Sequence, residues 1–147
     1  MNDFVNQQNA RPGGYDKVIA EITEQKICPF CPQHLNRIHT KPMEQRMFWI
    51  ITDNQFPYKP TKHHKLLIHR THIEHISQIS SEAWIELGEI LKEQTAIFKM
   101  SAGSMFMRFG DMRFTGSTVS HLHCQLLQSD PDDPSYDPKI GVFTRLG

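Results

Sequence analysis

Two imidazoles and an amide stand at alternate positions in the stretch G-S-T-V-S-H-L-H-C-Q-L-L-Q, which covers residues 116–128. In an extended chain His121, His123 and Gln125 share one face, and the intervening apolar residues share the other. The small residues 116–120 offer backbone N–H groups and hydroxyls that can approach an anion closely. An exposed polar strand face shows the same alternation, so spacing alone leaves both interpretations open. The combination favours phosphate chemistry carried out by a histidine.

A second group of reactive side chains is Cys28-Pro29-Phe30-Cys31. This spacing lets two thiolates face one tetrahedral metal ion. A redox pair is an alternative, but a thioredoxin-like site follows a strand and opens a helix in a βαβ unit, a pattern that residues 32–41 lack. Two inert buried thiols are a third interpretation, which leaves the spacing unexplained. Metal binding is favoured if two more ligands exist, and the chain has nine histidines to supply them.

Length and composition limit the kinds of protein this can be. A chain of 147 residues is long enough for one domain with a real core, so we expect a single domain over residues 1–147. Sixteen basic residues balance sixteen acidic ones, so neither a nucleic-acid polymer nor a membrane is expected as a partner. Signal-peptide and membrane-span patterns are missing, and three cysteines make a poor disulfide framework. We therefore expect a cytoplasmic protein.

The helices that must position these residues follow from hydrophobic periodicity. Apolar residues at helical spacing predict a short amphipathic helix over residues 15–25 and a long helix over residues 81–99. Ser80 or Ser81 is expected to cap the start of the long helix. The apolar face of the long helix is expected to consist of Trp84, Leu87, Ile90, Leu91 and Ile97.

Strands are predicted where apolar and β-branched residues run together or alternate. Their expected ranges are residues 47–52, 65–69, 104–109 and 119–128, with a last short strand over 140–146. Helices and strands do not alternate regularly, so the sheet is expected to be antiparallel and the fold class α+β. The polar residues 1–14 predict a flexible arm, and the acidic, proline-rich residues 129–147 predict an irregular tail.

Three segments, in this order along the chain, resemble the histidine-triad (HIT) proteins. They are D-N-Q-F-P-Y, H-H-K-L-L-I-H-R-T-H and G-S-T-V-S-H-L-H-C-Q-L-L, and the match covers residues 28–128. The resemblance implies a HIT-like α+β domain with an antiparallel sheet of about five strands, one long helix and one or two short helices. It also implies a nucleotide substrate and a homodimer.

Gln125 stands where most HIT proteins have the third histidine of H-x-H-x-H. In this the chain resembles the branch that contains galactose-1-phosphate uridylyltransferase and the diadenosine tetraphosphate phosphorylases. The resemblance implies that His123 attacks a nucleoside phosphate derivative, such as a dinucleoside polyphosphate, and forms a nucleotidyl-histidine. Water or another phosphate then takes the nucleotide, so hydrolysis and nucleotidyl transfer both stay open. His121 and Gln125 complete the implied catalytic set, in which Gln125 can donate a hydrogen bond to phosphate but cannot act as an acid.

The same resemblance implies a set of substrate-binding residues. Asn54 matches a ribose contact, Thr118 matches a phosphate contact with Val119 beside it, and Gln125 holds phosphate. Many family members have an asparagine where this chain has Gly110. This departure and Gln125 support an alternative function, a catalytically weakened nucleotide-binding or interaction module.

The resemblance also supplies the missing metal ligands. In many small bacterial HIT proteins a C-x-x-C pair joins the histidine of a P-K-x-H-like segment and the first histidine of the motif. Here these residues are Cys28, Cys31, His72 and His121. Two thiolates and two imidazoles form a closed tetrahedral set, so the implied zinc is structural.

Other conspicuous side chains receive weaker assignments. Arg108 and Arg113 lie close before the motif and are candidate phosphate contacts. Trp49 and Trp84 are expected in the core. No chemistry is assigned to four further histidines, which are His63, His64, His69 and His75.

Overall fold

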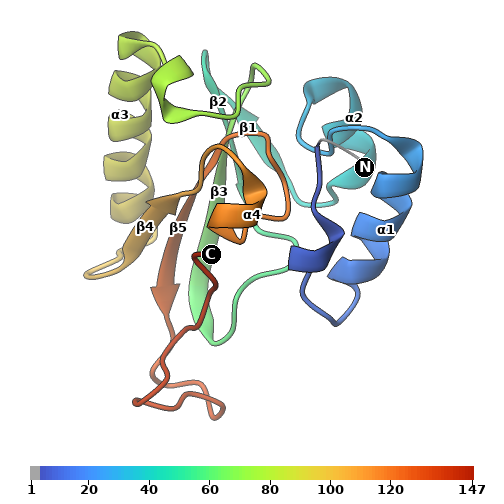
Figure 1. The fold of residues 1–147 in the computed structure, drawn as a ribbon. Helices are drawn as coiled ribbons and strands as arrows, with labels where there is room; N and C mark the ends of the chain where they lie inside the picture. The colour runs from blue at the N-terminus through green and yellow to red at the C-terminus, as the bar shows by residue number, and fades with distance from the viewer. Residues whose placement is uncertain (1–3) are drawn as a thin grey trace.

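A five-stranded antiparallel sheet forms the centre of the domain (Figure 1). The computed structural model describes residues 4–147, so the first three residues of the predicted arm lie outside the described part. Across the sheet the strands follow the order β1-β2-β3-β5-β4, and each neighbouring pair is antiparallel. The predicted α+β class, with an antiparallel sheet of about five strands, is confirmed.

The strands are β1 (Met43–Gln45), β2 (Trp49–Asp53), β3 (Thr61–His69), β4 (Ser104–Met107) and β5 (His123–Ser129). The predicted strands over 47–52, 65–69 and 104–109 correspond to β2, β3 and β4. The short strand β1 was not predicted, because three residues of mixed polarity carry no period-2 signal. The strand expected over 140–146 is wrong, since that part of the tail has no regular structure.

The helices are α1 (Tyr15–Gln25), α2 (Pro32–Ile38), α3 (Ser81–Ile97) and α4 (Met112–Thr115), with 3-10 turns at Gln7–Asn9 and Ile76–Gln78. Ser80 caps α3 as predicted, because its hydroxyl oxygen accepts a hydrogen bond from the Ala83 N–H at 3.1 Å. The short α2 begins with Pro32, at a position where the missing N–H costs nothing. Among the described residues no helix is both long and apolar enough to cross a membrane.

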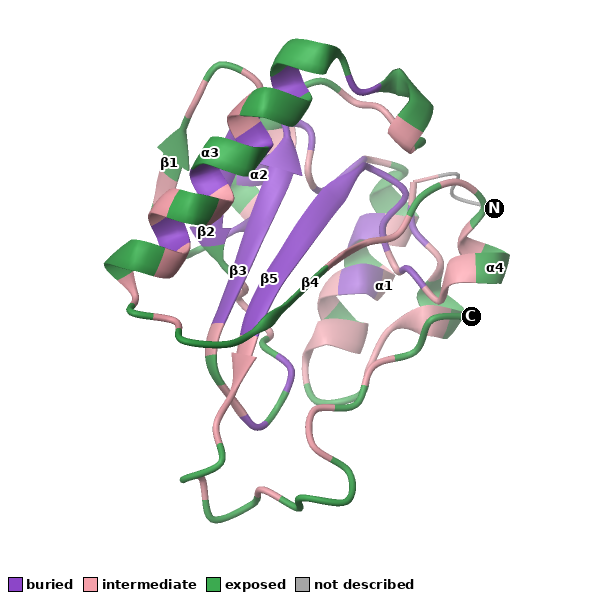
Figure 2. Cartoon of the chain, turned by 90° about the vertical axis from the view of Figure 1, so that its left-hand side faces the viewer, coloured by how far each residue is buried: buried purple, intermediate pink, exposed green. Residues whose placement is uncertain are grey.

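Helix α3 covers one face of the sheet (Figures 1 and 2). Trp49 is fully buried there beside Leu87, and its indole N–H donates to the Ala83 carbonyl at 2.8 Å. The expectation that Trp49 lies in the core is therefore confirmed. Trp84 and Ile97, also expected on the buried face, are 43 % and 58 % exposed because they lie beside the buried stripe of α3.

Helices α1 and α2 lie on the opposite face of the sheet (Figure 2). Leu35 of α2 packs against Ile50 of the sheet in one buried cluster. Ile19 of α1 packs with Val5 and Val119 in a second cluster. These clusters hold the C-x-x-C loop between α1 and α2 against the sheet, on the same face as the imidazole row.

The N-terminal segment packs on the domain. Val5 is only 4 % exposed and forms an isolated β-bridge with Val119. The Asn6 N–H also donates to the Thr118 carbonyl at 2.8 Å. The prediction of a flexible arm over 1–14 did not anticipate these contacts, because a lone valine among polar residues gives no strand pattern.

Strand β5 carries the motif. It pairs with β3, where Gln125 lies opposite Leu66, and with β4 on its other side. The predicted alternation is confirmed: Cys124 belongs to the core cluster beneath α3, whereas His123 and Gln125 line a cavity on the other face. The strand begins later than predicted, so His121 lies in the bend before it.

Candidate catalytic site and metal centre

A cavity of about 230 Å³ opens on the face of the sheet that α1 and α2 cover. Its wall combines the N-terminal segment, α1, the loop after β2, β5 and the C-terminal tail, which are far apart in the sequence. The lining residues predicted from sequence are His123, Gln125, Asn54, Thr118 and Val119. His121 does not line the cavity.

His123 combines burial with a defined tautomer. Its Nδ1 lies 2.8 Å from the backbone carbonyl oxygen of His121. Because a carbonyl oxygen only accepts, Nδ1 carries the proton and Nε2 keeps its lone pair. Burial lowers the pKa of His123 to about 4, and the charge of Arg108 adds to this effect. The hydrogen bond to the His121 carbonyl raises the pKa but is outweighed. The imidazole is therefore neutral near pH 7, with one nitrogen able to act as nucleophile or base.

The amide of Gln125 is held in one orientation by His64. The Tyr58 backbone N–H donates to His64 Nδ1 at 3.0 Å, so the proton of this imidazole is on Nε2. His64 Nε2 then donates to Gln125 Oε1 at 2.8 Å. The Gln125 NH₂ group is consequently directed to the Tyr58 hydroxyl, 3.3 Å away. Burial lowers the pKa of His64 to about 4, which keeps it neutral in this role.

Two arginines bring positive charge to the cavity. The Arg11 guanidinium lies over the Tyr58 ring, 4.4 Å from its centroid, and donates to the Phe56 carbonyl at 2.6 Å. Arg108 donates to the Tyr58 hydroxyl at 3.2 Å and to the Thr144 hydroxyl at 2.7 Å. The Arg108 Nε is buried and has no hydrogen-bond partner among residues 4–147. These groups make the cavity a suitable place for an anion.

The three remaining predicted substrate contacts differ in what they can offer a ligand. Asn54 Oδ1 accepts a hydrogen bond from the Phe56 N–H at 2.9 Å. The Asn54 NH₂ group lies 3.2 Å from His64 Nε2, but that nitrogen carries a proton and cannot accept from it. The NH₂ group is therefore available to a ligand. Thr118 donates its hydroxyl proton to the Asn9 carbonyl at 3.2 Å, so its oxygen still has acceptor capacity. Val119 presents an apolar side chain that packs mainly in the core.

The loop before the motif is less open to an anion than its composition indicates. The Ser117 N–H already donates to the Thr115 hydroxyl at 3.2 Å, and the Ser120 N–H donates to the Phe4 carbonyl at 3.0 Å. Gly116 ends α4 with a φ of 65°, and a Cβ there would lie 3.2 Å from Arg145. The glycine thus serves a tight turn beneath the tail.

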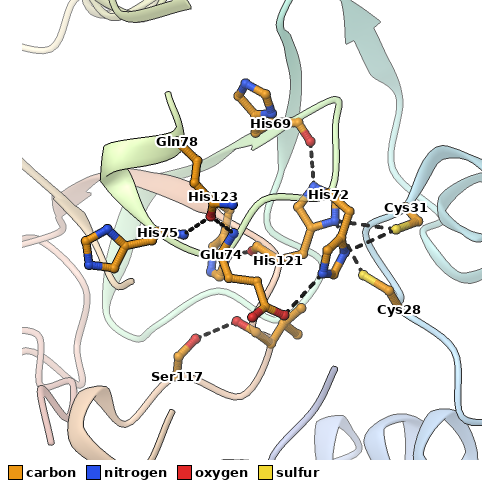
Figure 3. Close-up of polar contacts among 11 residues, drawn as sticks. Cys28, Cys31, His69, His72, Glu74, His75, Gln78, Ser117, His121 and His123 are labelled. Atoms are coloured by element: carbon orange, nitrogen blue, oxygen red, sulfur yellow. Dashed lines mark hydrogen bonds and ion pairs between the residues drawn. The ribbon is translucent and has the colours of Figure 1, made fainter. Parts of the chain in front are cut away.

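The four predicted metal ligands converge in one cluster beside the cavity (Figure 3). The candidate ligand atoms of Cys28, Cys31, His72 and His121 all lie within 4.8 Å of one another. His121 Nδ1 is 3.4 Å from Cys28 Sγ and 3.7 Å from Cys31 Sγ, and His72 Nδ1 is 3.3 Å from Cys31 Sγ. Tetrahedral zinc with ordinary bond lengths places sulfur and nitrogen about 3.6 Å apart. The cluster is therefore compatible with zinc.

Outer hydrogen bonds direct both imidazoles at the thiols. His121 Nε2 donates to the His69 carbonyl at 2.6 Å, and His72 Nε2 lies 3.2 Å from the Glu74 carboxylate (Figure 3). Both contacts place the proton on Nε2 and leave Nδ1 as the ligand atom. Burial raises the pKa of the Cys28 thiol to about 12 and lowers the pKa of His121 to about 3. The protein alone thus favours the uncharged forms of Cys28 and His121, whereas a bound cation stabilises thiolates.

Several cavity residues were missed in the sequence analysis. Arg11 and Thr144 come from the N-terminal segment and the tail, where no periodicity or motif marks them. Tyr58 ends the segment D-N-Q-F-P-Y, but nothing in that segment assigns the tyrosine a role. Of the two candidate arginines, Arg108 lines the cavity. Arg113 has a side chain that is 78 % exposed and pairs with Asp111 at 2.5 Å, so it lies outside the site.

No family model matches the chain, and no curated protein matches its sequence. Three solved structures with a similar fold are informative. A hypothetical histidine triad nucleotide-binding protein from Sulfolobus tokodaii is 20% identical, with a TM-score of 0.55, over 80% of this chain and 82% of that one. A HIT family hydrolase from Clostridium thermocellum is 18% identical, with a TM-score of 0.54, over 69% of this chain and 90% of that one.

The third is a Zn-bound histidine triad family protein from Mycobacterium smegmatis. It is 14% identical, with a TM-score of 0.51, over 71% of this chain and 78% of that one. At such identities the likeness concerns the arrangement of the backbone. The sheet order, the two covered faces and these superpositions agree with the three resembling segments: this chain has the histidine-triad fold.

Proposed function

We propose that this chain processes nucleotides, cleaving a nucleoside phosphate derivative through a covalent nucleotidyl-His123. The observation that carries the proposal is the neutral, buried His123 whose Nε2 lone pair is left free in the wall of a cationic cavity. Similarity to a HIT family hydrolase and to a histidine triad nucleotide-binding protein supports the same class of substrate.

The proposed reaction has two steps. His123 Nε2 attacks the α-phosphorus, an N–P bond forms, and the bond to the leaving group breaks. The Nδ1 proton stays in its hydrogen bond to the His121 carbonyl, which stabilises the positive charge on the imidazole ring. Water, which loses a proton to the solvent, or a second phosphate then attacks the phosphorus, and the N–P bond pair returns to Nε2. His121 acts as a positioning residue, because its carbonyl sets the tautomer of His123.

The remaining cavity residues have roles in binding. Arg11 and Arg108 balance the charge of the phosphates, and the Gln125 NH₂ group donates to a phosphate oxygen. Asn54 offers its free NH₂ group to a ribose hydroxyl, as the resemblance implies. Thr118 offers its hydroxyl oxygen, and Val119 gives the neighbouring wall an apolar surface.

A structural zinc held by Cys28, Cys31, His72 and His121 is part of the proposal. Its support is the convergence of the four donors, their outer hydrogen bonds and the zinc-bound protein of similar fold. All four positions of a tetrahedral ion are filled by protein, so the zinc supplies folding energy and no chemistry on the substrate.

The assembly is proposed on the resemblance alone, and the location on the sequence patterns given above. We expect a homodimer in the cytoplasm, acting on a small nucleotide without a nucleic-acid polymer or a membrane as partner. Sedimentation or light scattering of the purified chain tests the dimer, and a monomer at micromolar concentration would contradict it.

The test of the proposal is intact-protein mass spectrometry after mixing with adenylated, guanylated and uridylated polyphosphates. One nucleotidyl adduct is expected in the wild type, and none in His123→Ala. The matched control is His34→Ala, which changes a half-exposed histidine on α2 outside the cavity. If no adduct forms and no mononucleotide is released, the catalytic proposal fails and a nucleotide-binding or interaction module becomes the better account.

A second experiment separates hydrolysis from transfer. Replacing Gln125 with His restores the third histidine. If turnover with water rises while dependence on added phosphate falls, Gln125 favours transfer. Unchanged rates would show that residue 125 does not decide between hydrolysis and transfer.

A further inference from the structure

The Tyr58 hydroxyl lies at the centre of the polar groups in the cavity. Tyr58 is 7 % exposed, and its ring is held beneath the Arg11 guanidinium at 4.4 Å. Its oxygen is 3.2 Å from Arg108 NH1 and 3.3 Å from Gln125 Nε2. Tyr58 ends the segment D-N-Q-F-P-Y, but the resemblance implies no role for it, and the reaction described above does not use it.

Both neighbours of the phenol oxygen are donors. A guanidinium has no acceptor, and the hydrogen bond from His64 to Gln125 Oε1 leaves only the NH₂ group of Gln125 for Tyr58. The phenol oxygen therefore accepts two hydrogen bonds, and its own proton needs an acceptor elsewhere. The remaining partner of the phenol is the Thr144 hydroxyl on the half-exposed tail.

The position of Tyr58 matches that of a leaving group. His123 and Gln125 are two residues apart on one strand face, a separation of about 7 Å. In a near-attack arrangement the phosphorus lies about 3 to 3.5 Å from the attacking nitrogen, and the leaving oxygen lies one P–O bond farther on. A substrate aligned along β5 thus brings the leaving oxygen close to Gln125 and to the hydroxyl of Tyr58.

We propose that Tyr58 is a catalytic residue, the proton donor to the leaving oxygen. This inference rests on the proposed function. It adds a general acid to the reaction, a role that the amide of Gln125 cannot fill. It widens the substrate class from polyphosphates to nucleoside phosphate esters whose leaving group is a weak acid. A leaving oxygen that replaces Thr144 becomes the acceptor that the phenol proton requires.

The proton and electron balance is complete. As the N–P bond forms from the His123 Nε2 lone pair, the P–O bond breaks and its electron pair stays on the leaving oxygen. That oxygen takes the Tyr58 proton, and the phenolate is stabilised by the donors Arg108 and Gln125. In the second step water attacks the phosphorus and gives a proton to the phenolate, which restores Tyr58, while the N–P bond pair returns to His123.

The acidity of the phenol supports this role. Burial by itself raises the pKa of Tyr58, but its hydrogen bonds with Thr144, Arg108 and Gln125, together with the Arg108 charge, outweigh the effect of burial. The net pKa lies below the ordinary tyrosine value. Phenolate formation is thus easier at this position than on an ordinary tyrosine.

The test compares two aryl esters of the same nucleoside 5′-monophosphate in wild type and Tyr58→Phe. Phenol leaves poorly without a proton, whereas 4-nitrophenol leaves as a stable anion. We expect Tyr58→Phe to lower kcat/KM roughly 10²-fold or more on the phenyl ester and to change it little on the 4-nitrophenyl ester. Tyr136→Phe, a tyrosine of the tail outside the cavity, is the matched control and should match wild type on both.

The other outcomes are distinct. An equal loss on both esters would mean that Tyr58 only shapes or binds, and no loss on either would remove it from the reaction, so both overturn the inference. Retained activity on the 4-nitrophenyl ester shows that the variant is folded. If thermal melting shows that Tyr58→Phe is unfolded, 2-fluorotyrosine incorporation replaces it as the test. This change lowers the phenol pKa at all three tyrosines and must shift the rate on the phenyl ester alone. Failure of the wild type on both esters and on polyphosphates would instead refute the proposed function itself.

Discussion

Replacing His64 with Gln should remove a pH-dependent part of the stability of this domain. His64 is 4 % exposed, accepts the Tyr58 N–H at Nδ1 and donates to Gln125 from Nε2. The hydrogen bond from the Tyr58 N–H requires the neutral ring, because protonation of Nδ1 destroys its acceptor. A glutamine has one acceptor and one donor group but does not titrate.

The size of the effect follows from the pKa in the two states. The folded pKa of about 4 lies below the unfolded value, so the unfolded state takes up the proton first as the pH falls. The stabilisation is therefore complete above about pH 6.5 and is lost as the pH falls toward the folded pKa. The loss amounts to roughly 2 kcal/mol at pH 5 and roughly 3 kcal/mol at pH 4.

The assay is urea unfolding of both proteins between pH 7.5 and pH 4. The other titratable groups are the same in both proteins, so their contributions cancel in the difference. The wild type should lose about 2 kcal/mol more than His64→Gln on going from pH 7 to pH 5. Parallel stability curves would refute the reasoning that His64 is held neutral as the donor to Gln125.

Three further predictions concern the metal, the anion site and the core. Cys28→Ser should reduce bound zinc from about one equivalent to none by elemental analysis and lower the melting temperature. The control Cys124→Ser should keep the metal, and a metal-free wild type would contradict the prediction. Arg108→Gln should raise KM for a polyphosphate substrate roughly tenfold or more, and the exposed control Arg113→Gln should leave it unchanged. Leu87→Ala, at a position 1 % exposed, should cost about 2 to 5 kcal/mol in denaturant unfolding, and a cost below 1 kcal/mol would contradict the packing of α3.

The parts of the fold that sequence predicted are those with a strong local signal. Ser80 marks the start of α3, and the alternation around Cys124 places it in the core opposite His123. Where the signal is short, prediction failed: β1 has three residues, and α4 has four. Such elements are stable because neighbouring segments pack on them, which no local pattern records.

The candidate site divides in the same way. The motif and the C-x-x-C pair identified residues whose chemistry and spacing are informative in themselves. Arg11, Tyr58 and Thr144 meet in the cavity only because the N-terminal segment, a loop and the tail converge there. Contacts between residues more than forty positions apart have no signature in one sequence, so this half of the site could be found only in three dimensions.

His121 is the point at which the metal centre and the catalytic site meet. Its ring directs Nδ1 to Cys28 while Nε2 is held by the His69 carbonyl. Its backbone carbonyl accepts the Nδ1 proton of His123, which sets the tautomer of the proposed nucleophile. A metal that fixes this ring also fixes the peptide that carries the carbonyl, because both belong to one residue in the bend before β5. A structural zinc here would therefore preorganise the nucleophile without touching the substrate.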